Sequence, residues 1–206
     1  VIAEMEADIV ALQETDRRFG RRTGLLDRAR IERETGLRLL PQSDLPDGHG
    51  WHGNALLVRG EPRAYRRRRL SLPGVEPRGA VVAEIDFGRG PLPLRARQAE
   101  AILAAVAASE PMPTLLLGDL NEWRAGGPAL AVLEPLFGRA PRRPSFPSYR
   151  PVLSLDRILG WPGGLVADVE VHDTPLARVA SDHLPVKARL DLSGAVRRPA
   201  SVRAAA

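Results

Sequence analysis

The stretch from Thr114 to Trp123 constrains the fold of this chain more than any other. It opens on an apolar run between Pro113 and Gly118, which is typical of a short strand inside a sheet. Asp119 and Asn121 follow two residues apart, and alternate side chains of an extended chain point to the same side. A carboxylate and an amide at a strand end suit a hard cation or its bound water, together with a phosphate oxygen. The alternative is an Asx-turn, in which these side chains only cap the backbone.

A second apolar run, from Asp8 to Leu12, ends in Gln13 and Glu14. The carboxyl ends of strands are where α/β folds place their ligands, so Glu14 is a candidate ligand residue. The alternative is an ordinary exposed carboxylate at a strand end. Asn54 stands at the entrance of the next apolar run, 55–58, where it either binds a substrate or caps the strand.

The rest of the chain alternates short apolar runs with loops rich in Gly and Pro, which predicts a single α/β (α+β) domain over residues 1–192. Further strands are predicted at 37–40, 64–70, 78–87, 153–159, 165–172 and 184–192, and helices at 23–35, 95–109 and 127–137. Gly36 is the expected C-cap of the first helix. Residues 193–206 have no periodicity and are predicted to be a disordered tail.

Composition excludes several kinds of site. The chain has no Cys, so thiolate metal ligands and a Cys nucleophile are ruled out. It has no transmembrane segment and no visible signal peptide, which favours a cytoplasmic location. The net charge of +5 is modest for 206 residues, and Lys187 is the one lysine among 30 basic residues. The run Arg66–Arg69 is expected to be a solvated strand edge or loop, with phosphate contact as the alternative.

Five short motifs occur at predicted strand ends, and their order along the chain is informative. They are Leu12-Gln13-Glu14, Gly53-Asn54-Ala55, Gly118-Asp119-Leu120-Asn121, Leu155-Asp156-Arg157-Ile158 and Ser181-Asp182-His183. As a set they resemble the endonuclease/exonuclease/phosphatase superfamily, the deoxyribonuclease-I-like metal-dependent phosphodiesterases. The resemblance spans residues 1–192. It implies a four-layer α-β-β-α sandwich, in which two mostly antiparallel sheets pack face to face between outer helices, with the site at one end.

The resemblance also implies how metal and water would be held. Glu14 would bind a divalent cation, Mg²⁺ or Mn²⁺, and Asp182 would be a further carboxylate near it. Asp119 would orient or deprotonate the attacking water, while Asn121 would hold a phosphate oxygen and Asn54 would contact the substrate. The implied reaction is in-line attack of water on a phosphoester, either of nucleic acid or of a small phosphodiester.

An acid–base pair completes the implied site. Asp156 would hydrogen-bond the imidazole of His183, which fixes its tautomer and favours its protonated form. His183 would then act on the phosphate as an acid or base, or as a cation that stabilises developing charge.

Two pieces of the family pattern are absent from this sequence. One is a first strand that carries an Asn near the metal, and the other is a strand that ends in Thr-His, since no His occurs between His52 and His172. Losing a strand leaves backbone groups unpaired unless another segment, such as Pro91–Leu94, takes its place. His49 and His52 are expected to be solvated, and either one in the vacant position would favour an enzyme. The alternative function is a truncated, weak or inactive family member that acts as a binding or structural domain.

Overall fold

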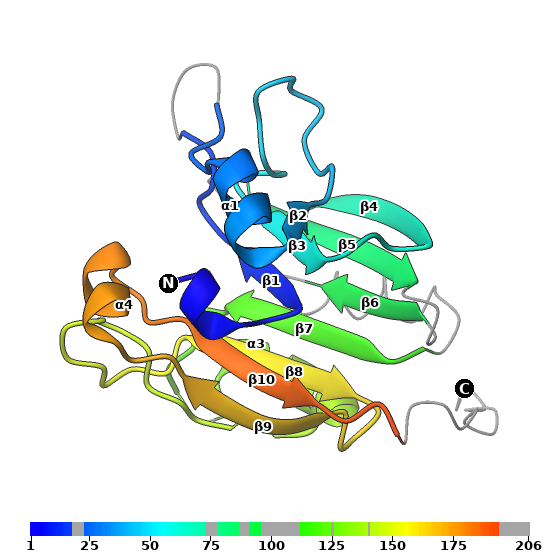
Figure 1. Cartoon of the computed structure of the whole chain (residues 1–206). Helices are drawn as coiled ribbons and strands as arrows, with labels where there is room; N and C mark the ends of the chain where they lie inside the picture. The colour runs from blue at the N-terminus through cyan, green and yellow to red at the C-terminus, as the bar shows by residue number, and fades with distance from the viewer. Residues whose placement is uncertain are drawn as a thin grey trace.

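One face of the sandwich is a five-stranded sheet (Figure 1). The structure, a computed structural model, describes residues 1–17, 23–72, 78–86, 91–95, 112–124, 126–139 and 141–193. The strands run in the order β4 (Ala64–Leu72), β5 (Arg78–Asp86), β6 (Pro91–Arg95), β7 (Thr114–Asp119) and β8 (Asp156–Trp161). All neighbours pair antiparallel except β6 and β7, which are parallel.

The facing layer consists of two separate small sheets. One has the order β1 (Ile9–Leu12), β3 (Ala55–Arg59), β2 (Leu37–Leu39), and the other pairs β10 (Val186–Leu190) with β9 (Val166–Val171). A buried cluster joins this layer to the five-stranded sheet through Leu56 and Val58 of β3, Ala83 and Ile85 of β5, and Leu115 of β7. The predicted pair of sheets packed face to face is therefore confirmed.

Helices cover both outer faces of these sheets (Figure 1). On one side, η1 (Ala3–Met5) and α1 (Arg28–Thr35) contribute Met5 and Ile31 to a cluster with Val10, Leu37 and Leu57. On the other side, α3 (Pro128–Phe137) packs Leu133 and Phe137 against Leu116 of β7 and Leu159 of β8. The layers follow the order helix, sheet, sheet, helix, as the resemblance to the family implies.

Helix α1 is shorter than its predicted range of 23–35. The Asp27 carboxylate accepts a hydrogen bond from the Arg30 backbone N–H at 3.0 Å, which starts the helix there. Gly36 ends it with φ +70°, as expected for a C-cap glycine. The helix α4 (Pro175–Ala180), capped by Thr174, was not predicted, because six residues are too few to show periodicity.

The sequence predicts that the Thr-His strand of the family is missing, but a short strand occupies its place in the sheet. Residues Pro91–Arg95 form β6, which pairs with β5 on one side and β7 on the other. Residues Pro91–Leu94 therefore take the place of the missing strand, as the sequence analysis considered. The sheet is continuous, and this strand contains no histidine. The predicted helix at 95–109 and the predicted tail at 193–206 lie almost entirely outside the described residues.

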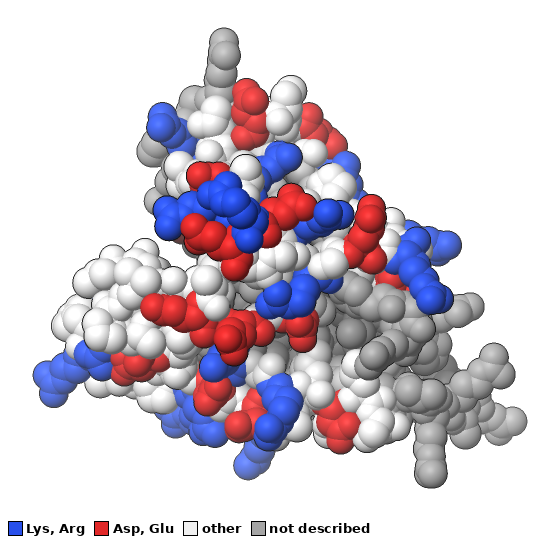
Figure 2. Space-filling model, viewed as in Figure 1, with Lys and Arg blue, Asp and Glu red and all other residues white. Residues whose placement is uncertain are grey.

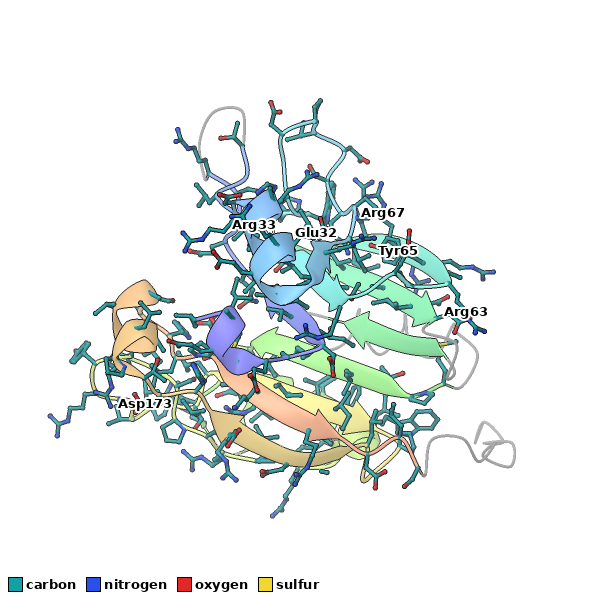
Figure 3. The ribbon with its side chains drawn as sticks, viewed as in Figure 1. Glu32, Arg33, Arg63, Tyr65, Arg67 and Asp173 are labelled. Atoms are coloured by element: carbon teal, nitrogen blue, oxygen red, sulfur yellow. The ribbon has the colours of Figure 1, made fainter. Side chains whose placement is uncertain are left out.

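The Arg66–Arg69 run belongs to β4, which is an edge strand, the first of the two predicted alternatives. Arg67 and Arg69 donate hydrogen bonds to the Asp44 carboxylate, and Arg67 also donates to the Pro41 carbonyl. Figure 3 shows Arg67 on this edge of the molecule, well away from α4. On the face seen in Figure 2, basic and acidic side chains are interspersed. Two of the four arginines therefore pair with acceptors of the protein itself. Among the described residues, no helix is long and apolar enough to cross a membrane.

Candidate active site

An open cavity of about 2320 Å³ extends from the ends of β1 and β7 back along β1 and β10. Its lining includes every site residue that the sequence predicts, namely Glu14, Asn54, Asp119, Asn121, Asp156, Asp182 and His183. These side chains come from segments as far apart in sequence as β1 and the loop before β10. All seven residues therefore border the same large cavity, and two of them, Asp156 and His183, are in direct contact.

The best defined part of the cavity is the pair formed by Asp156 and His183. The His183 Nδ1 atom lies 2.8 Å from Asp156 Oδ2, with 26% of the His183 side chain and 17% of the Asp156 side chain exposed. Asp156 begins β8, where it is the direct cross-strand partner of Asp119. A proton on Nδ1 in this bond leaves Nε2 as the nitrogen that can exchange a proton with a ligand.

Two residues that the sequence analysis missed hold this pair in place. The Ser145 hydroxyl, which is fully buried, donates to the same Asp156 oxygen at 2.5 Å. The Phe146 ring lies against the imidazole of His183, with 4.7 Å between ring centroids. The Asp156 carboxylate and the His183 ring therefore each have a neighbour that restricts their orientation.

The turn after β7 presents Asp119 and Asn121. The Asn121 backbone N–H donates to Asp119 Oδ1 at 2.7 Å, so the Asx-turn considered as an alternative does form. Asn121 has φ +50°, a left-handed conformation that Asn tolerates better than most residues. The Asp119 backbone N–H contacts Gln13 Oε1 at 3.4 Å, which links this turn to the end of β1. Both side chains line the cavity in this turn, so capping and a role in binding are compatible.

The position of Glu14 depends on contacts between its neighbour Thr15 and Gly53. Both the backbone N–H and the hydroxyl of Thr15 donate to the Gly53 carbonyl at 3.0 Å. A Cβ at Gly53 would lie 3.1 Å from the Glu14 Cα, so glycine permits this close approach. Glu14 itself has φ +56° and is exposed at the cavity. A non-glycine residue held in this sparsely populated conformation is common at functional sites.

The expectation that His49 is solvated is wrong. His49 is buried, its Nε2 lies 2.9 Å from the Leu26 carbonyl, and its backbone N–H donates to Asp16. The segment 41–52, which contains His49, therefore folds back onto the protein, and its Gly- and Pro-rich composition alone does not reveal this. His52 is half-buried and lines the same cavity as the site residues. Asn54 donates from Nδ2 to the Trp51 carbonyl at 3.0 Å, as the capping alternative predicts, and also lines the cavity.

Arg157 is a further residue that sequence reasoning did not single out, although it directly follows Asp156. It is only 3% exposed, and it donates to the carbonyls of Asp156 at 3.0 Å and Glu122 at 3.2 Å. Burial lowers the pKa of its guanidinium, and the nearby charge of Arg142 acts in the same direction. The hydrogen bond from Arg157 to the Glu122 carbonyl therefore links the segment after Asn121 to β8.

The donor set of the cavity suits a hard divalent cation. Glu14, Asp119 and Asp182 offer carboxylate oxygens, and the chain has no thiolate that would select a softer metal. Among the described residues, no three acidic or histidine side chains are grouped closely enough to hold an ion by themselves. Mg²⁺ usually takes only one or two carboxylates and keeps waters or substrate phosphates as its other ligands. One or two of these carboxylates would therefore be enough for an ion that also binds substrate.

Comparison with known proteins gives a family match and close sequence relatives. The model of the Endonuclease/Exonuclease/phosphatase family matches residues 1–183. The "Uncharacterized protein YbhP" of Escherichia coli strain K12 is 35% identical over 169 residues, which cover 71% of this chain and 65% of that protein. The protein of the same name from Shigella flexneri matches equally well. This chain thus spans less than two thirds of the length of these relatives.

Solved structures share the fold at low sequence identity. A protein from Enterococcus faecalis V583 matches with a TM-score of 0.67 and 18% identity, over 92% of this chain and 87% of that one. An endonuclease/exonuclease/phosphatase family protein from Leptotrichia buccalis has a TM-score of 0.65 and 16% identity, over 92% and 89%. The TDP2 protein of D. rerio, solved with a single-strand DNA product, has a TM-score of 0.56 and 16% identity, over 91% and 87%.

Proposed function

Because the chain belongs to the endonuclease/exonuclease/phosphatase family, we propose that it hydrolyses a phosphoester by metal-assisted, in-line attack of water. The observation that carries the proposal is the Asp156–His183 pair, which lines the same cavity as Glu14, Asp119 and Asn121. A carboxylate set for a cation and an imidazole for proton transfer are the two parts that such a reaction needs.

Each residue has a role in the proposed reaction. Glu14 and Asp182 would hold Mg²⁺ or Mn²⁺, which when bound would polarise the phosphoryl oxygens. Asp119 accepts a proton from the attacking water or orients it, and the Asn121 amide donates to a phosphate oxygen. His183, with Nδ1 directed to Asp156, presents Nε2 to the leaving oxygen or to a phosphate oxygen. Asp156 keeps the imidazole in this tautomer and offsets its positive charge.

The substrate class is proposed as nucleic acid or a small phosphodiester. TDP2 from D. rerio, a structural neighbour, was solved with single-strand DNA. Two of the four arginines of the run, Arg67 and Arg69, contact the Asp44 carboxylate, which does not favour a long basic track on the described surface. Testing both plasmid DNA and a small activated diester therefore covers both classes.

The second candidate is a family member that binds but does not turn over. The observation in its favour is β6, which takes a central place in the sheet without a histidine. A positioned acid or base contributes roughly 10²–10⁴-fold to rate, so the loss of one is a reason to expect weak activity. A folded preparation that binds Mn²⁺ but shows no turnover with any phosphoester would establish this second function.

Replacing Glu14 with glutamine tests the metal side of the site. We expect Glu14→Gln to weaken Mn²⁺ binding at least tenfold in calorimetry, since the change removes a charged ligand and keeps its shape. Hydrolysis of bis(p-nitrophenyl) phosphate and of plasmid DNA should fall in parallel. The control is Glu61→Gln, because the Glu61 side chain is 85% exposed and lies outside the cavity. Unchanged Mn²⁺ affinity in Glu14→Gln would contradict the assignment of Glu14 as a ligand.

Ser145 provides a test of the acid–base pair. We expect Ser145→Ala to lower kcat by about 10- to 100-fold, since a hydrogen bond to a charged group contributes about 1.5–3 kcal/mol. KM should change little, because Ser145 acts through Asp156 and does not touch substrate. The matched control is Ser148→Ala, whose buried hydroxyl donates to the Arg178 carbonyl instead. An equal fall of kcat in both variants would indicate general loss of structure and not a positioning role.

A further inference from the structure

A buried glutamine, Gln42, lines the cavity although only 1% of the residue is exposed. Within the described part of the chain, neither its amide oxygen nor its amide nitrogen makes a hydrogen bond of ordinary geometry. Leaving a buried amide unsatisfied is costly, so such a group calls for a bound water or a ligand. Gln42 has no part in the proposed reaction, and its amide therefore needs a separate explanation.

Tyr65, on β4 (Figure 3), lies close to Gln42 behind the wall of the cavity. Its ring packs against the buried cluster between the sheets, where Ile85 is its cross-strand partner. Burial raises the pKa of Tyr65 to about 12, although the charge of Arg67 and the contact with Gln42 act against it. The Tyr65 hydroxyl is therefore protonated at neutral pH. It can orient the Gln42 amide, which still keeps a donor and an acceptor for a ligand.

The fold places Gln42 at the end of the sandwich that carries the candidate site. The Leu40 backbone N–H donates to the Leu56 carbonyl at 2.8 Å, which continues the antiparallel pairing of β2 with β3. Two residues beyond this pair, one chain reaches Gln42 and the other reaches Asn54. The glycine before Asn54 is the one that approaches the Glu14 backbone closely. Gln42 therefore lies on the same side of the molecule as the proposed metal ligand and borders the same cavity.

The chemistry of this side chain determines what it can bind. An amide is uncharged and presents a donor and an acceptor side by side in one plane. Apolar residues of β3 and β5 also line the cavity, namely Leu56, Val81 and Ala83. A flat, uncharged group with an adjacent donor and acceptor fits such surroundings. Adenine is the base whose N6–H donor and N7 acceptor pair with a glutamine amide in protein–DNA complexes.

We propose that Gln42 determines substrate specificity by binding the edge of an adenine base with its side-chain amide. This assignment rests on the proposed reaction, in which the phosphoester of the same nucleotide is cleaved beside Glu14 and Asp119. A sugar separates the base from the phosphate, so one substrate molecule can contact both parts of the cavity. Tyr65 is a positioning residue, which orients the amide and does not touch the base. A buried polar group that loses its partner discriminates strongly, so a substrate without the base is bound poorly.

The first test compares two p-nitrophenyl phosphodiesters with Mn²⁺, one of deoxyadenosine 5′-phosphate and one of a base-free deoxyribose 5′-phosphate. The ratio of their kcat/KM values is expected to be about tenfold or more in favour of adenine. Gln42→Leu, which keeps the size of the side chain and removes the amide, should abolish this ratio, and Tyr65→Phe should reduce it less. The matched control is Thr114→Val. Thr114 is also buried, but its hydroxyl donates to the Met112 carbonyl and it lies outside the cavity, so the ratio should persist.

A second test needs no turnover and so separates this proposal from the proposed reaction. Deoxyadenosine 5′-phosphate and base-free deoxyribose 5-phosphate are titrated into the Mn²⁺-loaded protein in a calorimeter. The nucleotide is expected to bind at least tenfold more tightly, and Gln42→Leu should remove the difference. That result without hydrolysis of any ester would end the proposed reaction and keep the role of Gln42. Equal affinities, no binding of either phosphate, or a preference that survives in Gln42→Leu would overturn the proposal and leave the amide to an ordered water only.

Discussion

Replacing His183 with alanine is expected to lower the rate of metal-dependent phosphoester hydrolysis by roughly 10²–10⁴-fold, the usual contribution of a positioned acid or base. The physical reason is the bond between His183 Nδ1 and Asp156 Oδ2, which leaves Nε2 as the proton donor or acceptor of the cavity. Initial rates with bis(p-nitrophenyl) phosphate, at saturating Mg²⁺ and Mn²⁺, measure the loss. Mn²⁺ affinity should change much less than the rate, since His183 is not proposed as a ligand.

The matched control for this substitution is His172→Ala. His172 is also half-buried and also contacts a carboxylate, Glu4, at 3.1 Å, but it lies outside the cavity. A folded His172→Ala protein should therefore keep its turnover. A wild-type rate in His183→Ala, or an equal loss in both variants, would contradict the proposed role of His183. Asp156→Asn, which preserves shape but removes the charge, should give an intermediate loss.

The sequence predicts the strands of this fold because their apolar runs are short and well bounded. The run before Gly118 and the run before Gln13 both form strands, β7 and β1, close to the predicted limits. Asp119 and Glu14 lie at the ends of these strands as expected, since strand period and direction are local properties. That the seven predicted residues border one cavity could be expected only from the resemblance to a family. The resemblance indicates which distant segments lie together, and periodicity does not.

Ser145 and Arg157, which support the site residues Asp156 and Asn121, could not be predicted from the sequence, because their contacts depend on how distant segments fold together. Ser145 lies eleven positions before Asp156 in a Pro- and Arg-rich loop with no periodicity. Its hydroxyl reaches the carboxylate where the neighbouring Phe146 forms an isolated β-bridge to Leu153. In the sequence, Arg157 cannot be told apart from the other arginines of an Arg-rich chain. In the structure its guanidinium is buried and donates to two backbone carbonyls. Contacts of this kind depend on how loops fold back, and local sequence carries little information about that.

Replacing Leu116 with alanine is expected to lower the free energy of unfolding by about 2–5 kcal/mol, the range for truncating a fully buried leucine. Leu116 is fully buried in the centre of β7, in one cluster with Leu133 and Phe137 of α3 and Leu159 of β8. Urea denaturation followed by circular dichroism measures the change, which should appear as a lower midpoint with a similar slope. The control is Leu176→Ala on α4, where the side chain is 50% exposed and a change within about 0.5 kcal/mol is expected.

The same variant separates stability from chemistry, because successive residues of β7 face opposite layers. Leu116 faces α3, whereas Leu117 packs in the core between the sheets and Asp119 shares the face of Leu117. Truncating Leu116 therefore leaves a void on the side away from the cavity. Below its unfolding transition, Leu116→Ala should keep the turnover per folded molecule within about threefold, even though it is far less stable. A loss of turnover as large as that of His183→Ala would show that the α3 layer and the site are coupled through β7.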